Sequence, residues 1–153
     1  MLEIGQEAPL FALPNQQGEM RLLKDYQGQY VVLYFYPEDN TPGCTQQACS
    51  YRDTMPEFTK RKIKVFGISK DGGESHRQFE KDFDLNFELL SDEDMKTINA
   101  YEVWGEKIKN DVPYMGVIRT TFVVDPNGKI IKVFPKVDPK LDSQQVLEFI
   151  DQH

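Results

Sequence analysis

An uninterrupted apolar stretch from Tyr30 to Tyr36 is the feature that most restricts how this chain can fold. Its residues are aromatic or aliphatic, and none of them is charged. A strand with one exposed face would alternate apolar and polar residues, whereas a strand covered on both faces reads as a continuous apolar run. The stretch therefore predicts a central strand, ending at Pro37, in a sheet that has layers on both sides.

The remaining segments predict that helices alternate with strands. Apolar residues at helical spacing indicate a helix from Thr41 to about residue 60, which Pro56 should kink or restart. Lys64–Ser69 is expected to form a second buried strand, with a helix starting near Glu74. The other expected elements are an N-terminal β-hairpin (10–13 and 21–23), a second hairpin around a turn at 125–128 (121–124 and 129–134) and a closing helix through residues 146–150.

This order predicts an α/β fold with a mixed central sheet and helices on both faces. The early strands need crossover connections and are parallel, while the late hairpin is antiparallel. The arrangement is consistent with a thioredoxin-like fold preceded by an N-terminal β-hairpin. No repeat or linker divides the 153 residues, so we expect residues 1–153 to form a single domain.

Composition excludes several classes of partner. The chain has 18 Lys and Arg against 25 Asp and Glu, a net charge of -7, and no basic run that would attract nucleic acid or an anionic membrane. The longest apolar run is too short to span a bilayer, and the first seven residues lack the basic start of a secretory signal. We therefore expect no nucleic-acid or membrane partner and a cytoplasmic location, where cysteines are mostly reduced.

Cys44 occupies the position most favourable for a reactive thiol. Thr41 is a good N-cap residue, Pro42 suits the first helical position, and Cys44 then falls in the first turn of the predicted helix. Unpaired backbone N–H groups and the helix dipole favour a thiolate there. Without that setting, a buried cysteine that only packs would be the ordinary interpretation.

Cys49, the only other cysteine, follows five residues later. In a regular helix the Cα atoms of such a pair are about 8.6 Å apart, beyond the reach of a disulfide of roughly 7 Å. The two thiols can therefore react with each other only if the helix unwinds locally. A small core residue remains the alternative interpretation of Cys49. Two cysteines with the remote His76 and His153 do not match a zinc site, and nothing ties His76 to Cys44 as a catalytic base.

The pattern Pro37-x3-Thr41-x2-Cys44 resembles the active-site signature of the peroxiredoxins, and Cys49 five residues on resembles their Q-type (bacterioferritin comigratory protein) subfamily. The resemblance covers nearly the whole chain, since further blocks match at 5–11, 89–92, 101–107 and 119–122. It implies a thioredoxin fold and a thiol-dependent peroxidase that reduces hydrogen peroxide and organic hydroperoxides, without a cofactor or metal.

The resemblance also implies roles for individual residues. Cys44 would be the peroxidatic cysteine that becomes a sulfenic acid, and Cys49 the resolving cysteine that forms an intramolecular disulfide with it. Pro37, Thr41 and Arg119 would support the reacting thiol. By residue type alone Arg119 would be a surface ion-pair member. Thioredoxin or a similar dithiol would recycle the enzyme, which we expect to be a monomer rather than a dimer.

Two positions depart from the family pattern: Glu38 stands where lysine is common, and Asp142 where many members carry histidine. Neither is expected to belong to the catalytic set. Two other functions remain open, a general thiol–disulfide oxidoreductase and a non-enzymatic redox sensor. The first typically uses a Cys-x-x-Cys motif, which this chain lacks.

Overall fold

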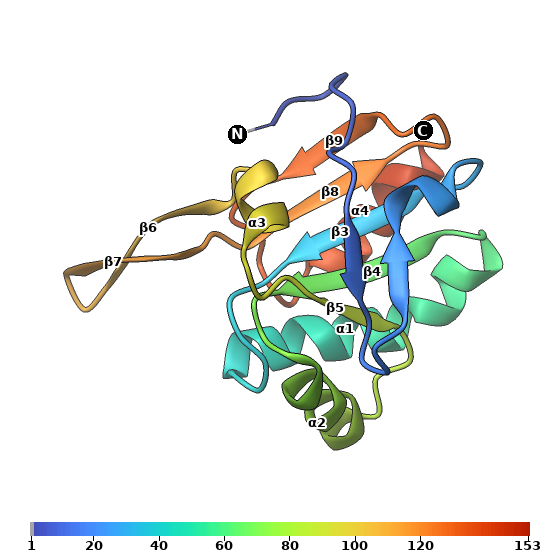
Figure 1. The fold of residues 1–153 in the computed structure, drawn as a ribbon. Coiled ribbons are helices and arrows are strands. Elements are labelled where there is room, and N and C mark those ends of the chain that lie inside the picture. Colours follow the sequence, from blue (N-terminus) through green and yellow to red (C-terminus); the bar gives the residue numbers. More distant parts are fainter. Residues whose placement is uncertain (1) are drawn as a thin grey trace.

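A five-stranded mixed sheet forms the centre of the computed structural model, which describes residues 2–153 (Figure 1). Strands β3, β4 and β5 are parallel, and β8 and β9 continue the sheet in antiparallel pairing. The order across the sheet is β5 (Glu88–Ser91), β4 (Lys64–Ser69), β3 (Val31–Phe35), β8 (Thr120–Val124) and β9 (Ile130–Phe134). The mixed sheet predicted from the sequence is confirmed, with β3 at its centre.

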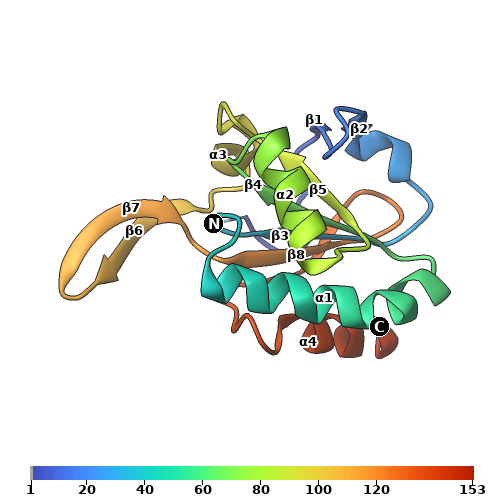
Figure 2. The ribbon, with the colours of Figure 1, turned by 90° about the horizontal axis from the view of Figure 1, so that it is seen from below.

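The two faces of the sheet carry separate apolar cores. Val31, Leu33 and Phe35 point into one core, and Val32 and Tyr34 into the other, as a fully buried strand requires. Helices α1 (Pro42–Lys60), α2 (Gly73–Phe83) and α4 (Asp142–Asp151) contribute to the second core, and α1 and α4 lie side by side (Figure 2). The first core is closed by the N-terminal segment, the 3-10 helix η1 (Leu23–Tyr26) and α3 (Lys96–Ala100). None of the helices in residues 2–153 has the length and apolar character to cross a membrane.

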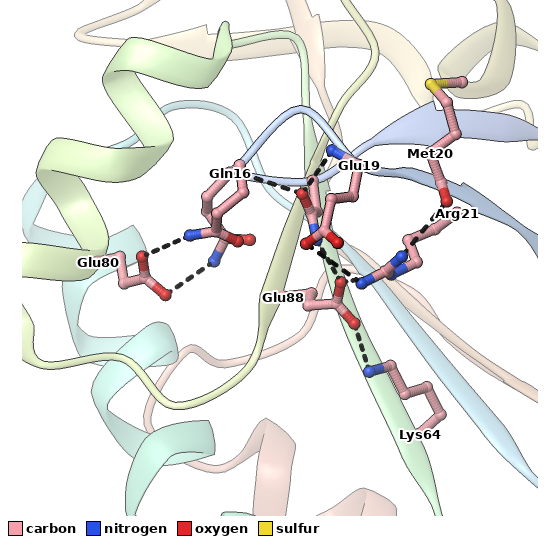
Figure 3. A network of polar contacts seen from close by, with 9 residues as sticks. Gln16, Glu19, Met20, Arg21, Lys64, Glu80 and Glu88 are labelled. Carbon is pink, nitrogen blue, oxygen red and sulfur yellow. Dashed lines mark hydrogen bonds and ion pairs between the residues drawn. The ribbon is translucent and has the colours of Figure 1, made fainter.

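The predicted N-terminal hairpin is present as β1 (Ala12–Pro14) and β2 (Met20–Leu22). Side chains around Glu88, on the edge strand β5, attach it to the sheet (Figure 3). The Glu88 carboxylate accepts hydrogen bonds from Asn15 Nδ2 and Arg21 Nε, both at 2.6 Å, and from the ammonium of Lys64. One carboxylate thus joins the hairpin to β4 and β5.

The segment between β4 and β8 contains elements that the sequence patterns did not predict. Besides β5 and α3, strands β6 (Trp104–Lys109) and β7 (Val112–Val117) form an antiparallel arm that projects from the body of the protein (Figures 1 and 2). Ile108 and Val112 near its tip are exposed. An arm exposed on both faces has no alternation of buried and exposed residues, which is the signal by which strands are recognised.

Helix α1 runs through Pro56 without ending, so of the two predicted outcomes, a kink or a restart, the restart is wrong. A proline cannot donate to the carbonyl four residues earlier. That carbonyl, of Arg52, instead accepts a hydrogen bond from Asn86 Nδ2 at 3.2 Å. Met55 and Phe58 are buried on either side of the proline. Packing and a substitute donor therefore keep the helix continuous.

Candidate active site

The loop after β3 delivers Cys44 into the first turn of α1, as the sequence predicts. Thr41 is the N-cap in extended conformation, and Pro42 is the first helical residue. The first helical hydrogen bond runs from the Thr45 N–H to the Thr41 carbonyl at 2.8 Å. The N–H of Cys44 precedes that bond and has no partner within the helix.

The Thr41 side chain does not cap the helix. Its Oγ1 donates to the Glu38 carbonyl at 3.1 Å instead. Since the hydroxyl has one hydrogen, its lone pairs are what remain for another group. Thr41 is therefore an acceptor toward the site.

Arg119, at the start of β8, brings a positive charge to the thiol. Its Nη2 lies 3.5 Å from Cys44 Sγ, and Cys44 is 1% exposed. A Cβ on Gly43 would lie 3.1 Å from the same Nη2, so glycine leaves room for the guanidinium. Residues 75 positions apart in sequence thus form a partly buried contact between a sulfur and a cation, which favours the thiolate.

A cavity of about 540 Å³ adjoins this helix start. Pro37, Thr41, Gly43 and Arg119 line it on the side of α1. The β6–β7 arm supplies the other wall with apolar and cationic side chains, namely Trp104, Lys107, Lys109, Tyr114, Met115 and Val117. Cys44 does not itself line the cavity, but Arg119, which touches its sulfur, does. Pro37, Thr41, Cys44 and Arg119 are thus brought together as predicted.

Lys107 is a second cation beside the thiol that sequence reasoning did not single out. Its ammonium donates to the Val117 carbonyl at 2.9 Å, and its stem passes over Gly116, where a Cβ would lie 3.2 Å from Lys107 Cδ. Burial, together with the neighbouring Arg119, lowers the pKa of Lys107. The arm therefore positions a partly desolvated cation at the cavity wall.

Gln47 and Asp142 form the second part of the site that sequence reasoning missed. Arg119 Nη1 donates to Gln47 Oε1 at 2.6 Å, and Gln47 Nε2 donates to Asp142 Oδ2 at 3.0 Å. Both residues are fully buried. Asp142 had been noted only as a departure from the family pattern outside the catalytic set, yet it is linked to Arg119 through one side chain. A contact between residues 95 positions apart leaves no sequence signal.

Cys49 lies apart from Cys44. It borders a separate surface depression, lined also by residues of α1 and by Lys140 and Gln144. Both cysteines are free, and α1 is helical throughout the segment between them. The structure is therefore the reduced form, in which the two thiols are kept apart by the helix.

His76, which the sequence does not connect to Cys44, is fully buried in a polar network of its own. Its Nδ1 lies 2.7 Å from Asp39 Oδ2 and its Nε2 lies 3.2 Å from the Leu90 carbonyl. Asp39 also accepts hydrogen bonds from Tyr36 and Ser75, and its N–H donates to Asp71. This network ties the loop between β3 and α1 to α2.

Asp39, Asp71 and His76 are also the one group in residues 2–153 whose ligand atoms lie close enough together to hold a metal ion. Asp39 Oδ2 accepts from Ser75 Oγ at 2.8 Å and faces the His76 ring, and Asp71 Oδ2 accepts from Ser69 Oγ at 2.7 Å. These bonds already engage the atoms that would bind an ion. The group is explained by its role in holding the loop.

Taken together, the site offers a buried thiol, a guanidinium in contact with it, an unpaired N–H and a hydroxyl with free lone pairs. Comparison with known proteins bears on what such a set does. The model of the AhpC/TSA family matches residues 4–133. The putative peroxiredoxin bcp of Coxiella burnetii is 46% identical over 136 residues, which cover 89% of this chain and 90% of the relative.

Two further relatives extend the match to nearly the whole chain. Peroxiredoxin Bcp of Escherichia coli (strain K12) is 44% identical over 152 residues, covering 99% of this chain and 97% of the relative. The solved structure of the Xanthomonas campestris bacterioferritin comigratory protein, described with alkyl peroxide reduction activity, superposes with a TM-score of 0.90 at 30% identity. It covers 99% of both chains.

Proposed function

Since the chain belongs to the AhpC/TSA family and is a peroxiredoxin, a thiol-dependent peroxidase, we propose that Cys44 is the thiol that attacks the peroxide. The observation that carries this assignment is the contact between Arg119 Nη2 and Cys44 Sγ at 3.5 Å, in the first turn of α1. A cation and a helix N-terminus together favour the thiolate, which is the nucleophile.

The first step oxidises Cys44. Its thiolate attacks the terminal oxygen of the hydroperoxide, so that an S–O bond forms and the O–O bond breaks. The leaving alkoxide takes up a proton and departs as an alcohol, or as water from hydrogen peroxide. Cys44 is left as a sulfenic acid.

The groups around the thiol act on the peroxide oxygens. Arg119 and the Cys44 N–H donate to the oxygens as negative charge develops on the leaving atom. Thr41 Oγ1, whose hydrogen goes to Glu38, accepts the hydrogen bond from the peroxide O–H. Pro37, in the wall of the cavity, limits the access of water.

These donors matter more than thiolate formation alone. Lowering the pKa of a thiol from about 8.5 to about 6 raises its thiolate fraction roughly 30-fold at pH 7. The same change reduces the reactivity of each thiolate about 13-fold, so the net gain is only roughly two- to three-fold. The remaining acceleration has to come from electrostatic stabilisation of the transition state.

Cys49 is proposed to complete the cycle. Its thiolate attacks the sulfenic sulfur of Cys44, the S–S bond forms as the S–O bond breaks, and the leaving hydroxide takes up a proton and departs as water. Because α1 separates the two thiols, residues between them must leave the helix first. A dithiol reductant, which we propose to be thioredoxin or a similar protein, then reduces the disulfide and is itself oxidised.

The cavity supports a broad choice of substrate. Trp104, Tyr114 and Met115 supply apolar surface next to Arg119, which suits organic hydroperoxides as well as hydrogen peroxide. The alkyl peroxide reduction reported for the Xanthomonas campestris relative agrees with this proposal. We further propose that residues 1–153 act as a single-domain monomer in the cytoplasm.

Single-turnover kinetics test the assignment. Trp104 is the only tryptophan and lines the cavity, so its fluorescence can report oxidation after rapid mixing with peroxide. Cys44→Ser is expected to consume no peroxide. Cys49→Ser is expected to consume one equivalent, to be over-oxidised more readily and to cycle poorly with thioredoxin, as mass spectrometry of the thiols would show.

Two results would contradict the assignment. Peroxide consumption by Cys44→Ser at the wild-type rate would remove Cys44 from the first step. Normal thioredoxin-coupled turnover by Cys49→Ser would remove Cys49 from the cycle while leaving Cys44 in place.

A further inference from the structure

Asp142 is a carboxylate held in the interior at the first turn of α4. Its side chain is fully buried, and its Oδ2 accepts three hydrogen bonds. The donors are Gln47 Nε2 at 3.0 Å and Tyr51 OH at 2.7 Å from α1, and Thr121 Oγ1 at 2.8 Å from β8. Its Oδ1 has no hydrogen-bond partner among residues 2–153. Burying a carboxyl group with one unpaired oxygen is costly, so a reason for keeping Asp142 at this position is expected.

The Gln47 side chain can take only one orientation between its two neighbours. Its Nε2 faces Asp142, which accepts hydrogen bonds, and its Oε1 faces Arg119, which only donates them. A flipped amide would place oxygen against the carboxylate and N–H groups against the guanidinium. Asp142 therefore determines which end of Gln47 is presented to Arg119.

Gln47 in turn holds Arg119 against the thiol. Within residues 2–153, Gln47 Oε1 is the one oxygen to which the guanidinium donates, through Nη1 at 2.6 Å. The other contact of the guanidinium is Nη2 to Cys44 Sγ at 3.5 Å. A small displacement at a group that stabilises a transition state has a large effect on rate.

We propose that Asp142 is a positioning residue for peroxide reduction, which acts on Arg119 through the Gln47 amide. The inference rests on the proposed function of Cys44 and Arg119. The alternative is that Asp142 only attaches α4 to α1 and β8. The two roles differ in one respect: a positioning residue matters for the rate only as long as Arg119 is present.

The position of Gln47 adds a second consequence. It lies between Cys44 and Cys49, so the opening of residues 44–49 pulls Gln47 away from Asp142. The Asp142–Gln47 hydrogen bond therefore favours the closed helix. Loss of the Asp142 carboxylate is expected to slow peroxide attack and to speed disulfide formation. A general loss of stability does not predict that the two rates change in opposite directions.

The test compares Asp142→Leu, which removes the acceptor, with Asp142→Asn, which keeps an oxygen for Gln47. Trp104 fluorescence reports the second-order rate with hydrogen peroxide, and thermal unfolding reports stability. Asp142→Leu is expected to slow attack about 10-fold, and Asp142→Asn to stay within about three-fold of wild type although its new amide N–H is buried without a partner. The change in the rate of peroxide attack is then not proportional to the change in stability.

Ser143→Ala provides the matched control at the same interface. Ser143 is buried on α4, and its Oγ lies 2.5 Å from Ser50 Oγ and 3.2 Å from Thr54 Oγ1 on α1. Neither bond involves Gln47 or Arg119. This variant is expected to lose stability and to keep the wild-type rate within about two-fold.

The deciding measurement is a double-mutant cycle. In an Arg119→Ala background, Asp142→Leu is expected to slow attack by no more than about two-fold, because the group it positions is already gone. A full additional 10-fold loss, or an equal loss in Ser143→Ala, overturns the inference. Should Asp142→Leu not fold, Gln47→Met cuts the same connection and is expected to give the same loss; a wild-type rate in Gln47→Met also overturns it. A wild-type protein that does not reduce peroxide would instead disprove the proposed function.

Discussion

Glu88 and Asp142 both gather hydrogen-bond donors from several elements, but they differ in how their charge is balanced. Glu88 is partly exposed, with an 18% exposed side chain, and faces the cations of Arg21 and Lys64 directly (Figure 3). Asp142 is fully buried and accepts only from neutral side chains. Glu88 joins two parts of a fold that stays closed in the proposed cycle, whereas Asp142 contacts the helix that this cycle requires to open.

The difference appears in the proton affinity of the two carboxylates. Burial raises the pKa of Asp142, and the hydrogen bonds from Tyr51, Thr121 and Gln47 offset that effect only in part. Burial also acts to raise the pKa of Glu88, but hydrogen bonds from Lys64 and Asn15 outweigh it and lower the pKa. Direct pairing with cations thus favours the charged form of Glu88, while burial disfavours the charged form of Asp142.

The largest expected effect separates the two arginines of these networks. Arg119→Ala is expected to slow peroxide attack about 100- to 1,000-fold, because it removes a donor to the developing charge. Arg21→Ala is expected to lower stability by only about 1 kcal/mol and to leave the rate unchanged. Rapid-mixing kinetics and denaturant unfolding measure the two quantities. If the rate loss in Arg119→Ala equals the loss of thiolate fraction, the electrostatic role is wrong.

The second-largest expected effect is a change in amide hydrogen exchange on oxidation, near the Asp142 network but not near the Glu88 network. In the disulfide form, amides of residues 41–52 are expected to exchange about 100-fold faster than in the reduced form, because the helix has unwound between the thiols. Amides of β1 and β2, next to Glu88, should exchange equally in both forms. Hydrogen exchange followed by mass spectrometry checks both regions. Unchanged protection of residues 41–52 would contradict the unwinding.

The smallest effect is a pair of opposite pH dependences of stability. The lowered pKa of Glu88 stabilises the folded protein at pH values above the unfolded pKa of about 4.3. Glu88→Gln is therefore expected to lower the free energy of unfolding by about 1–2 kcal/mol at pH 7. This difference from wild type should disappear as the pH falls below about 4. The raised pKa of Asp142 acts the other way, since stability is lost as the pH rises from about 4 through the folded pKa.

The difference in free energy of unfolding between wild type and Asp142→Asn should therefore become smaller as the pH rises. Tyr51 and Tyr34 stay neutral across this range, because burial raises their pKa values well above normal. Urea unfolding of the wild type and both variants between about pH 2.5 and pH 7 checks the two trends, the Glu88 trend below about pH 4 and the Asp142 trend above it. If the stability differences of the two variants from wild type changed with pH in the same direction, the two carboxylates would not differ in the direction of their pKa shifts.

Much of the fold was predictable because its signals are local. The apolar run at β3 and the turn residues between β8 and β9 indicated these elements directly. The short strand β5 and the exposed β6–β7 arm lack a clear periodic pattern, so they were missed. The contribution of Asn86, which replaces the donor that Pro56 lacks, depends on tertiary contact and could not be read from helix propensity.

The residues of the candidate site also divide into those with a local sequence signal and those without one. Thr41, Pro42 and Cys44 are neighbours whose types indicate a helix start and a reactive thiol, and the family resemblance indicated Arg119. Gln47 and Asp142 are ordinary residue types, and their roles come from two contacts across 72 and 95 positions of sequence. His76 was judged by its neighbours in sequence, although Asp39 and the Leu90 carbonyl decide its burial.

Pro56 has a consequence for the size of the segment that opens. The hydrogen-bond ladder of α1 is interrupted at Arg52, whose carbonyl is satisfied by Asn86 from outside the helix. In the proposed cycle, unwinding that starts at Cys44 therefore reaches a carbonyl that has no bond to the nitrogen of residue 56 to lose. The last two turns, which bury Met55 and Phe58, can keep their structure while the first turns exchange with coil. On this basis we expect the proposed redox cycle to open only a short cooperative unit and to leave the apolar core shielded from water.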